Sequence, residues 1–215
     1  SDATGELGQF GLYGAGADAL VETMAVGAKQ LSLHHVINTD GAWIVRAHNL
    51  AGGGYEVIAK PSVIEKLAID AQSLGAVQAS EELYDLLRIE AGLPGAGREI
   101  SDAYIPLEVG LSDAVSFDKG CYIGQEIIAR MESRGKLAKT LIGLRSDSEL
   151  PSGATLRSRD GGRRGIITSS VHSPRLGWIG IGLIKPDMAE PGALLAVERN
   201  GDFLPVTVTT LPFGN

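Results

Sequence analysis

The 215-residue chain has one cysteine, Cys121, and this scarcity limits both its chemistry and its location. A single cysteine cannot form an intrachain disulfide, so we predict a reducing compartment, the cytoplasm. Nor can a single cysteine hold an iron–sulfur cluster, since such clusters are bound by several thiolates. Any cluster chemistry would therefore need ligands from another protein.

Long apolar runs are missing as well. No stretch approaches the roughly 18 continuous apolar residues that a membrane span needs. The chain opens with the polar residues Ser1-Asp2-Ala3-Thr4, which do not resemble a signal peptide. We therefore expect no membrane partner.

Positive charge is in short supply, with 19 Lys and Arg against 26 Asp and Glu and a net charge of −7. This balance argues against general nucleic-acid binding. The charge is uneven, because residues 119–145 carry six cations and two anions, a local +4 that leaves −11 elsewhere. This segment could bind an anionic ligand or an acidic partner, or it could be a solvated helix end and linker.

Helical and strand-like patterns alternate in the first part of the chain. Helices are expected over residues 17–28, from Pro61 onward, and over 81–91 with Ser80 as N-cap. Strands are expected over 42–49 and 55–60, with glycines 52–54 as the hairpin turn.

The remaining sequence changes character near residue 133. Residues 93–118 form a long, turn-rich connection, and a short helix is expected from Glu126. Thereafter strands follow one another, at 141–144, 164–170, 178–184, 194–198 and 205–209, with hairpin turns at 160–162 and 200–201. We predict an α+β domain over residues 1–136 and a small antiparallel β-barrel over 137–215.

Two patterns in the first part of the chain resemble ligand sites but are weak signals. Residues 14–19 fit G-x-G-x-x-A and precede a helix, and Asp40 follows at the spacing of a dinucleotide site. The next elements are predicted to form an antiparallel hairpin, which favours a tight strand-to-helix turn instead. The pair His34-His35 is not a metal signature, because adjacent strand residues point to opposite faces. No metal site is predicted.

The string Lys119-Gly120-Cys121-Tyr122-Ile123-Gly124-Gln125-Glu126 is the most informative stretch. Cys121 lies just ahead of an expected helix and near Lys119, and both the helix dipole and the lysine charge favour the thiolate form of its side chain. Cys121 could be a nucleophile or redox thiol, a transient metal or cluster ligand, or a small buried residue. Gln125 and Glu126 could simply satisfy the first helical turn.

This string, followed by Ala129-Arg130, resembles the signature of the YgfZ-type folate-binding proteins, which are relatives of the glycine-cleavage T-protein (GcvT, aminomethyltransferase). Residues 87–94 resemble the Arg-x-Glu-Ala-Gly-x-Pro segment of the same superfamily, and residues 211–213 its Leu-Pro-Phe ending. The resemblance extends from about residue 6 to the end.

The resemblance implies a GcvT/YgfZ-like fold that binds tetrahydrofolate or a derivative. It implies a pterin-binding role for Glu56, within Gly53-Gly54-Tyr55-Glu56, and a pocket-lining role for Arg88. A fixed carboxylate can accept two parallel hydrogen bonds from an amino group and a ring N–H. The alternatives are a solvent-facing glutamate and a helix-surface ion pair.

The resemblance and the motif together give eight candidate site residues. Cys121 is the candidate functional thiol, and the candidate folate-binding residues are Glu56, Arg88, Tyr55, Lys119, Tyr122, Gln125 and Glu126. Relatives have Tyr-Thr-Gly-Glu where this chain has residues 49–52, so one tyrosine contact is missing. Their N-terminal stretch, with part of the folate site and a catalytic aspartate, has no counterpart here.

Three functions remain open. The first is a tetrahydrofolate-binding protein that assists iron–sulfur cluster assembly or repair, with iron–sulfur client or assembly proteins as partners. The second is a folate-dependent aminomethyltransferase or demethylase on the same scaffold. The third is a non-catalytic interaction module with a vestigial cavity.

Overall fold

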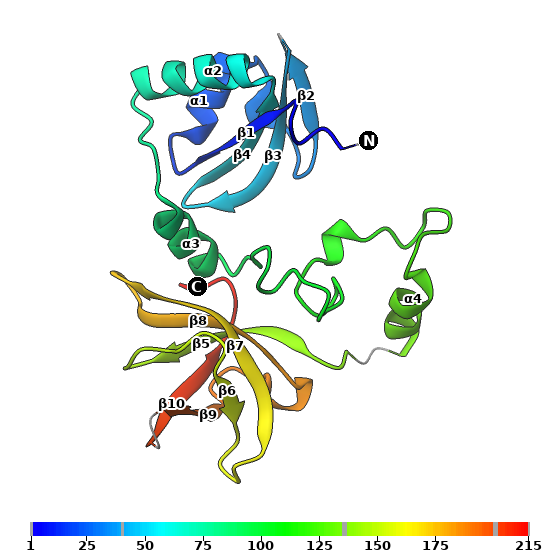
Figure 1. Ribbon diagram of the computed structural model, residues 1–215, viewed down its shortest axis with the longest axis vertical. Helices are drawn as coiled ribbons and strands as arrows, with labels where there is room; N and C mark the ends of the chain where they lie inside the picture. The colour runs from blue at the N-terminus through cyan, green and yellow to red at the C-terminus, as the bar shows by residue number, and fades with distance from the viewer. Residues whose placement is uncertain (1, 40, 135–136, 200–201, 215) are drawn as a thin grey trace. The chain divides into compact units, whose positions relative to one another are not determined.

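The chain folds into two units (Figure 1). The computed structural model describes residues 2–39, 41–134, 137–199 and 202–214, and divides into unit 1, Ser1–Leu83, and unit 2, Tyr84–Asn215. The α+β class with a closed antiparallel barrel is confirmed. The domain boundary expected between residues 136 and 137 stays a prediction, because residues 135 and 136 lie outside the described residues.

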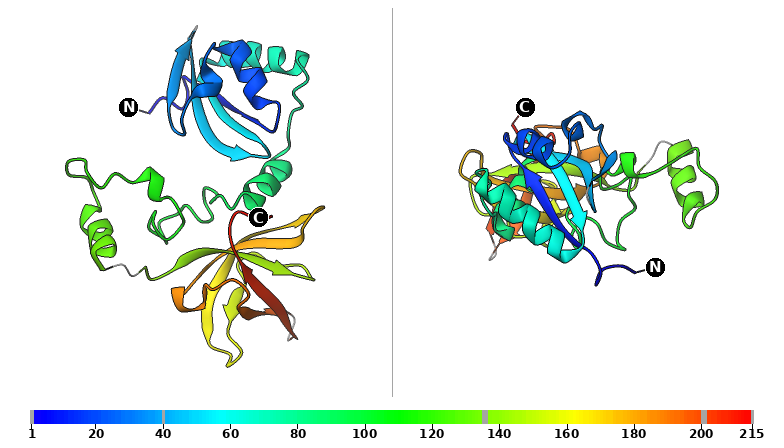
Figure 2. Two further views of the ribbon diagram at one scale, coloured as in Figure 1. Left: turned by 180° about the vertical axis from the view of Figure 1, so that it is seen from behind. Right: turned by 90° about the horizontal axis from the view of Figure 1, so that it is seen from above.

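Unit 1 is a four-stranded antiparallel sheet with helices on one face. Its strands are β1 (Gly8–Tyr13), β2 (Val36–Thr39), β3 (Ala42–Leu50) and β4 (Gly53–Ala59), in the order β1-β4-β3-β2. Its helices are α1 (Ala17–Met24), the 3₁₀ turn η1 (Ala28–Gln30) and α2 (Pro61–Ser73). As Figures 1 and 2 show, α1 and α2 lie together against the sheet, and their Val21 and Ala71 share a core with Val57 of β4.

The first helix is shorter than the sequence indicates. It ends at Met24, since Ala25 is extended and Gly27 has a φ of 88°. The carboxylate of Glu22 accepts hydrogen bonds from the Gly27 and Lys29 amides at 2.8 and 3.2 Å. A side-chain acceptor for these amides competes with helix continuation.

Residues 14–16 form the tight strand-to-helix turn that the sequence favoured, between β1 and α1, and the structure excludes the dinucleotide alternative. Every described strand pair in unit 1 is antiparallel, whereas that site requires parallel βαβ units. Gly14 has a φ of 95°, which favours glycine at this turn. Its carbonyl lies so close to Gly53 of β4 that a Cβ on Gly53 would be 2.7 Å from it. Asp40 lies outside the described residues.

Unit 2 contains most of helix α3, a long connection that includes helix α4, and a barrel. Its helical elements are α3 (Glu81–Glu90), η2 (Ser112–Ala114), α4 (Gln125–Arg134) and η3 (Pro186–Met188). The Ser80 hydroxyl accepts the Leu83 amide at 3.3 Å, which confirms the predicted N-cap. Among the described residues, no helix is both long and apolar enough for a membrane crossing.

The barrel closes in the order β10-β5-β8-β7-β6-β9. Its strands are β5 (Thr140–Ser146), β6 (Thr155–Arg157), β7 (Arg163–Ser173), β8 (Gly177–Ile184), β9 (Leu194–Arg199) and β10 (Asp202–Thr209). Leu144 and Leu156 fill the interior, and Gly182 of β8 leaves room for both. The opposite face of β8 packs through Ile179 and Ile181 against Ile89 of α3.

Candidate functional site

Glu56 lies on the face of the unit 1 sheet that α1 and α2 do not cover. Side chains alternate along a strand, so Tyr55 and Val57 are buried on the helix side while Glu56 points the other way. Glu56 as a whole is half-buried. The predicted strand and its alternation are confirmed, and they place the carboxylate on an open sheet surface.

Two neutral donors from β1 hold this carboxylate. Gln9 Nε2 donates to Glu56 Oε2 at 2.8 Å, and the Tyr13 hydroxyl donates to Glu56 Oε1. Both donors reach across the β1–β4 pairing, in which Gly11 lies directly opposite Glu56. Each oxygen of an ionised carboxylate can accept two hydrogen bonds, so acceptor capacity remains for a ligand.

Gly11 permits this arrangement. A Cβ at Gly11 would overlap the ring and hydroxyl of Tyr13, because the tyrosine folds back along its own strand above the glycine. A glycine inside a strand often marks such a close approach. The relatives' tyrosine is absent from residues 49–52, but a tyrosine hydroxyl reaches Glu56 from another strand.

The rest of this sheet face is largely apolar. Val45 pairs with Glu56 across β3 and β4, and Trp43 pairs with Ile58. Trp43 is 41% exposed, and Val36 of β2, which pairs with Val45, is 54% exposed. An apolar, partly aromatic surface with a fixed carboxylate can hold a planar heterocycle that presents adjacent N–H donors.

Tyr55 lies on the opposite side of β4 from Glu56. Its hydroxyl donates to Asp18 Oδ1 at 2.6 Å, and the Arg46 guanidinium stacks 4.5 Å from its ring centroid. Burial and then the bond to Asp18 raise the pKa of Tyr55 to about 12, while the Tyr55 and Arg46 hydrogen bonds lower the pKa of Asp18. A ligand on Glu56 would therefore not meet the Tyr55 side chain.

Arg88 is buried in unit 2, with its donors on protein acceptors. Its guanidinium donates to Asp85 at 2.6 Å, the Leu93 carbonyl at 3.2 Å, Ser169 at 3.0 Å and Glu99 at 3.4 Å. The residue is 2% exposed. These bonds join α3, the following loop and β7 of the barrel.

The carboxylates around Arg88 are themselves fixed. Glu99 is fully buried and also accepts the Ser169 hydroxyl at 2.7 Å and the Gly95 amide at 2.8 Å. Burial acts to raise the pKa of Asp85, but the Arg88 hydrogen bond and the charges of Arg88 and Arg98 outweigh it and lower that pKa. The cluster thus has a buried centre of Arg88, Glu99 and Ser169, with the partly exposed Asp85 at its edge.

Cys121 is exposed and lies ahead of α4. Four positions separate it from Gln125, the first helical residue. Lys119 Nζ lies 5.1 Å from the Tyr122 ring centroid, and Glu126 pairs with Arg130 at 2.5 Å. The dipole of a helix acts mainly within its first turn, so activation of the thiol by α4 stays a prediction.

Four cations of residues 119–145 have local contacts. Besides Lys119 and Arg130, Lys139 lies 4.5 Å from the Tyr104 ring centroid and Arg145 lies 5.7 Å from that of Phe213. The Lys136 part of this segment lies outside the described residues. An anion-binding role for the segment stays a prediction.

Comparison with known proteins assigns these features to a superfamily. Residues 139–214 match the family described as the glycine cleavage T-protein C-terminal barrel domain. An aminomethyltransferase of Saccharopolyspora erythraea is 35% identical over 157 residues, covering 71% of this chain and 42% of the relative. An aminomethyltransferase of Rubrobacter xylanophilus is 31% identical over 221 residues, covering 99% of this chain and 58% of the relative. The chain belongs to the glycine-cleavage T-protein superfamily.

A solved structure of a superfamily member supports the fold. The chain matches the aminomethyltransferase T of the glycine cleavage system from Bartonella henselae with a TM-score of 0.83 and 22% identity. The match covers 97% of this chain and 60% of that chain. The chain thus spans about half of the curated relatives it matches, between 42% and 62% of the first three.

Sequence reasoning missed Gln9 and Tyr13. Each lies more than 40 residues before Glu56 in the chain, and only the β1–β4 pairing brings them together. One signal was available, because Gly11 interrupts an otherwise regular strand pattern.

Proposed function

We propose that this chain supplies a tetrahydrofolate-binding sheet and the C-terminal barrel of a folate-dependent aminomethyltransferase. Relatives named aminomethyltransferase, and the barrel match, support this more directly than they support iron–sulfur assembly. The proposal therefore takes the second of the functions left open by the sequence.

The observation that carries the proposal is the carboxylate of Glu56 on the open sheet face. Gln9 and Tyr13 each donate a hydrogen bond to one of its two oxygens and so fix its orientation. A pterin ring offers an amino group and an adjacent ring N–H, which match two carboxylate oxygens. Apolar neighbours such as Trp43 would cover the ring faces.

Binding and orientation are the tasks that these residues perform in the proposed reaction. Transfer of an aminomethyl group requires a nitrogen of tetrahydrofolate to be held in line with the donor carbon. Glu56 would anchor the far edge of the pterin and so set that position. Arg88 would act as a positioning residue within unit 2, since its guanidinium is occupied by protein acceptors.

Calorimetric titration of tetrahydrofolate into the chain tests the proposal. Glu56→Gln keeps the shape but loses the charge and one acceptor pair, so affinity should fall at least tenfold, about 1.4 kcal/mol or more. Glu65→Gln, on the exposed side of α2, is the matched control and should bind as the unaltered chain does. Equal affinities for the two variants would refute the pterin role of Glu56.

A YgfZ-type role in iron–sulfur maintenance is a second candidate, supported by the exposure of Cys121 within its motif. The two functions separate with Cys121→Ser. A transferase should retain aminomethyl transfer to tetrahydrofolate in this variant. A thiol-dependent maintenance factor should bind folate normally but stop protecting an iron–sulfur enzyme from oxidative inactivation.

A further inference from the structure

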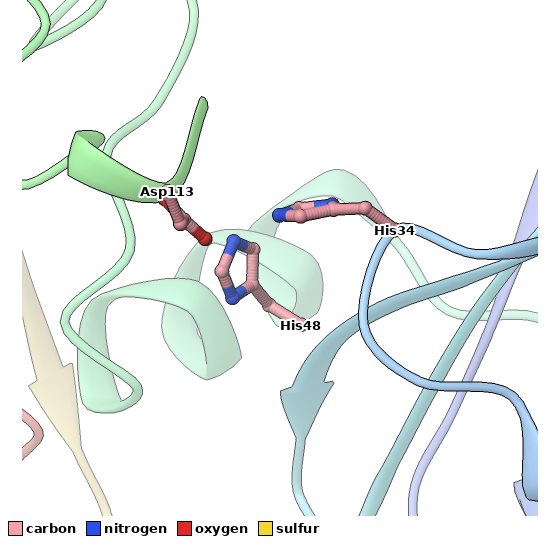
Figure 3. A group of neighbouring side chains, drawn as sticks. All are labelled: His34, His48 and Asp113. Carbon is pink, nitrogen blue, oxygen red and sulfur yellow. The ribbon is translucent and has the colours of Figure 1, made fainter. Parts of the chain in front are cut away.

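Two histidines that are 14 positions apart in the sequence lie together in unit 1. The ring centroids of His34 and His48 are 5.3 Å apart, with the rings nearly perpendicular (Figure 3). Their potential ligating nitrogens lie within 4.8 Å of one another. His34 is exposed and His48 half-exposed. Asp113, also labelled in Figure 3, belongs to unit 2.

His34 is presented by an unusual backbone conformation. It lies in a turn that the His35 amide closes onto the Ser32 carbonyl at 2.9 Å, and its own φ is 66°. Glycine or asparagine is the favoured residue at such a position, and a histidine there costs conformational free energy. Strained positions of this kind cluster at functional sites.

His48 is presented by a second irregularity. The register between β3 and β4 shifts between Arg46 and Leu50, so His48 lies in a bulge of β3. The bulge depends on Gly54, because a Cβ there would overlap the His48 carbonyl oxygen. Bulges commonly re-aim a side chain, and here one turns His48 toward His34.

We propose that His34 and His48 form a binding site for a borderline divalent metal ion such as Zn²⁺. Neutral imidazoles are preferred ligands of this class of ion. Zinc–nitrogen bonds of about 2.0–2.1 Å in tetrahedral geometry place two ligand nitrogens about 3.3 Å apart. The two nitrogens lie within 4.8 Å of each other, so ion binding requires them to approach by no more than about 1.5 Å, and water would complete the coordination.

Zinc titration of the chain, prepared without a polyhistidine tag, tests this site. His34→Asn retains a residue that tolerates positive φ, and His48→Gln retains a polar side chain of similar length. We expect one Zn²⁺ per chain, with affinity reduced at least tenfold in each variant. His35→Asn, beside the site, and His172→Asn, in the barrel, are the matched controls and should leave affinity unchanged.

A second readout does not depend on the variants. In the unaltered chain, Zn²⁺ should shift the imidazole NMR signals of His34 and His48 and leave those of His172 in place. Absence of saturable Zn²⁺ binding would overturn the proposal. So would binding that survives both substitutions, or signals that move equally for all four histidines.

Discussion

Charged side chains differ in burial and in bonding partners between the unit 1 sheet and the barrel unit, unit 2. In the barrel unit, Arg88 and Glu99 are buried and satisfy each other together with Ser169. On the sheet, Glu56 is half-buried and accepts hydrogen bonds from two neutral side chains, Gln9 and Tyr13. The Arg88 and Glu99 side chains hydrogen-bond to other protein groups in the interior, whereas the Glu56 carboxylate can still accept hydrogen bonds from a ligand.

The same contrast separates the two apolar surfaces. The barrel interior is filled, and the outer face of β8 is covered by Ile89 and Phe213. The sheet buries one face under α1 and α2 but leaves Trp43 and Val36 substantially exposed on the other. Burial therefore marks the regions that stabilise the fold, and the partly exposed sheet face is the surface to which the proposed function assigns the ligand.

Arg88→Met should break the buried cluster and have the largest effect. Removing one partner of a buried ion pair leaves the other, Glu99, in the interior without its cation, a loss of about 3–5 kcal/mol. The two tryptophans, Trp43 in unit 1 and Trp178 in unit 2, allow each unit to be followed separately. Denaturant unfolding of the Trp43→Phe background should show the loss through Trp178.

The control for this prediction is Arg98→Met. Arg98 bonds Asp85 but is 43% exposed, so its loss should cost less than about 1 kcal/mol. Adding Glu99→Gln to Arg88→Met should recover part of the stability, because it removes the unpaired charge. If the single Arg88 variant is as stable as the Arg98 variant, the cluster does not stabilise unit 2.

Gly182→Ala should show that the barrel interior has no spare room. A Cβ at this position would lie 2.8 Å from the Ile166 carbonyl and 3.0 Å from Leu144. Overpacking of this kind costs about 1–3 kcal/mol. The Trp178 signal should report a lower unfolding midpoint, and an unchanged midpoint would mean that β8 relaxes without strain.

Alkaline pH should weaken unit 1 through Tyr55. Its folded pKa of about 12 exceeds the ordinary value of 10.0, so the folded state favours the neutral phenol. Stability is fully present below pH 10 and is lost as the pH rises toward 12, by up to about 2 kcal/mol. In Trp178→Phe protein, the Trp43 signal should follow this loss, and Tyr55→Phe should remove that pH dependence.

The fold was largely predictable from the sequence because its signals are local. Pro61 and Ser80 mark the starts of α2 and α3, and strands separated by turns predicted the barrel. The three-residue strand β6 was missed, since so short a segment shows no periodicity. The turn expected at 200–201 lies outside the described residues.

The candidate site was only partly predictable because its contacts are long-range. Glu56 was found through its resemblance to relatives, and its strand from the local pattern. Gln9 and Tyr13 depend on the β1–β4 register, and the His34–His48 pair depends on a turn and a bulge. These long-range contacts produce no periodic pattern of apolar residues that could be read from the sequence. The glycines at positions 11 and 54, inside strands, mark where the close contacts occur.

Of the substitutions predicted here to change stability, Gly11→Ala should have one of the smallest effects, and it tests directly whether the open sheet face binds tetrahydrofolate. The new methyl group would displace the Tyr13 ring, which can swing into solvent, so unit 1 should lose less than about 1 kcal/mol. Tetrahydrofolate affinity should nevertheless fall several-fold, because Glu56 would lose the hydroxyl that orients it. Tyr13→Phe should reproduce the affinity loss without the steric change. A small stability loss with a large binding loss is the reverse of what Gly182→Ala should give in the barrel, and matching behaviour at the two glycines would mean that the open face is only structural.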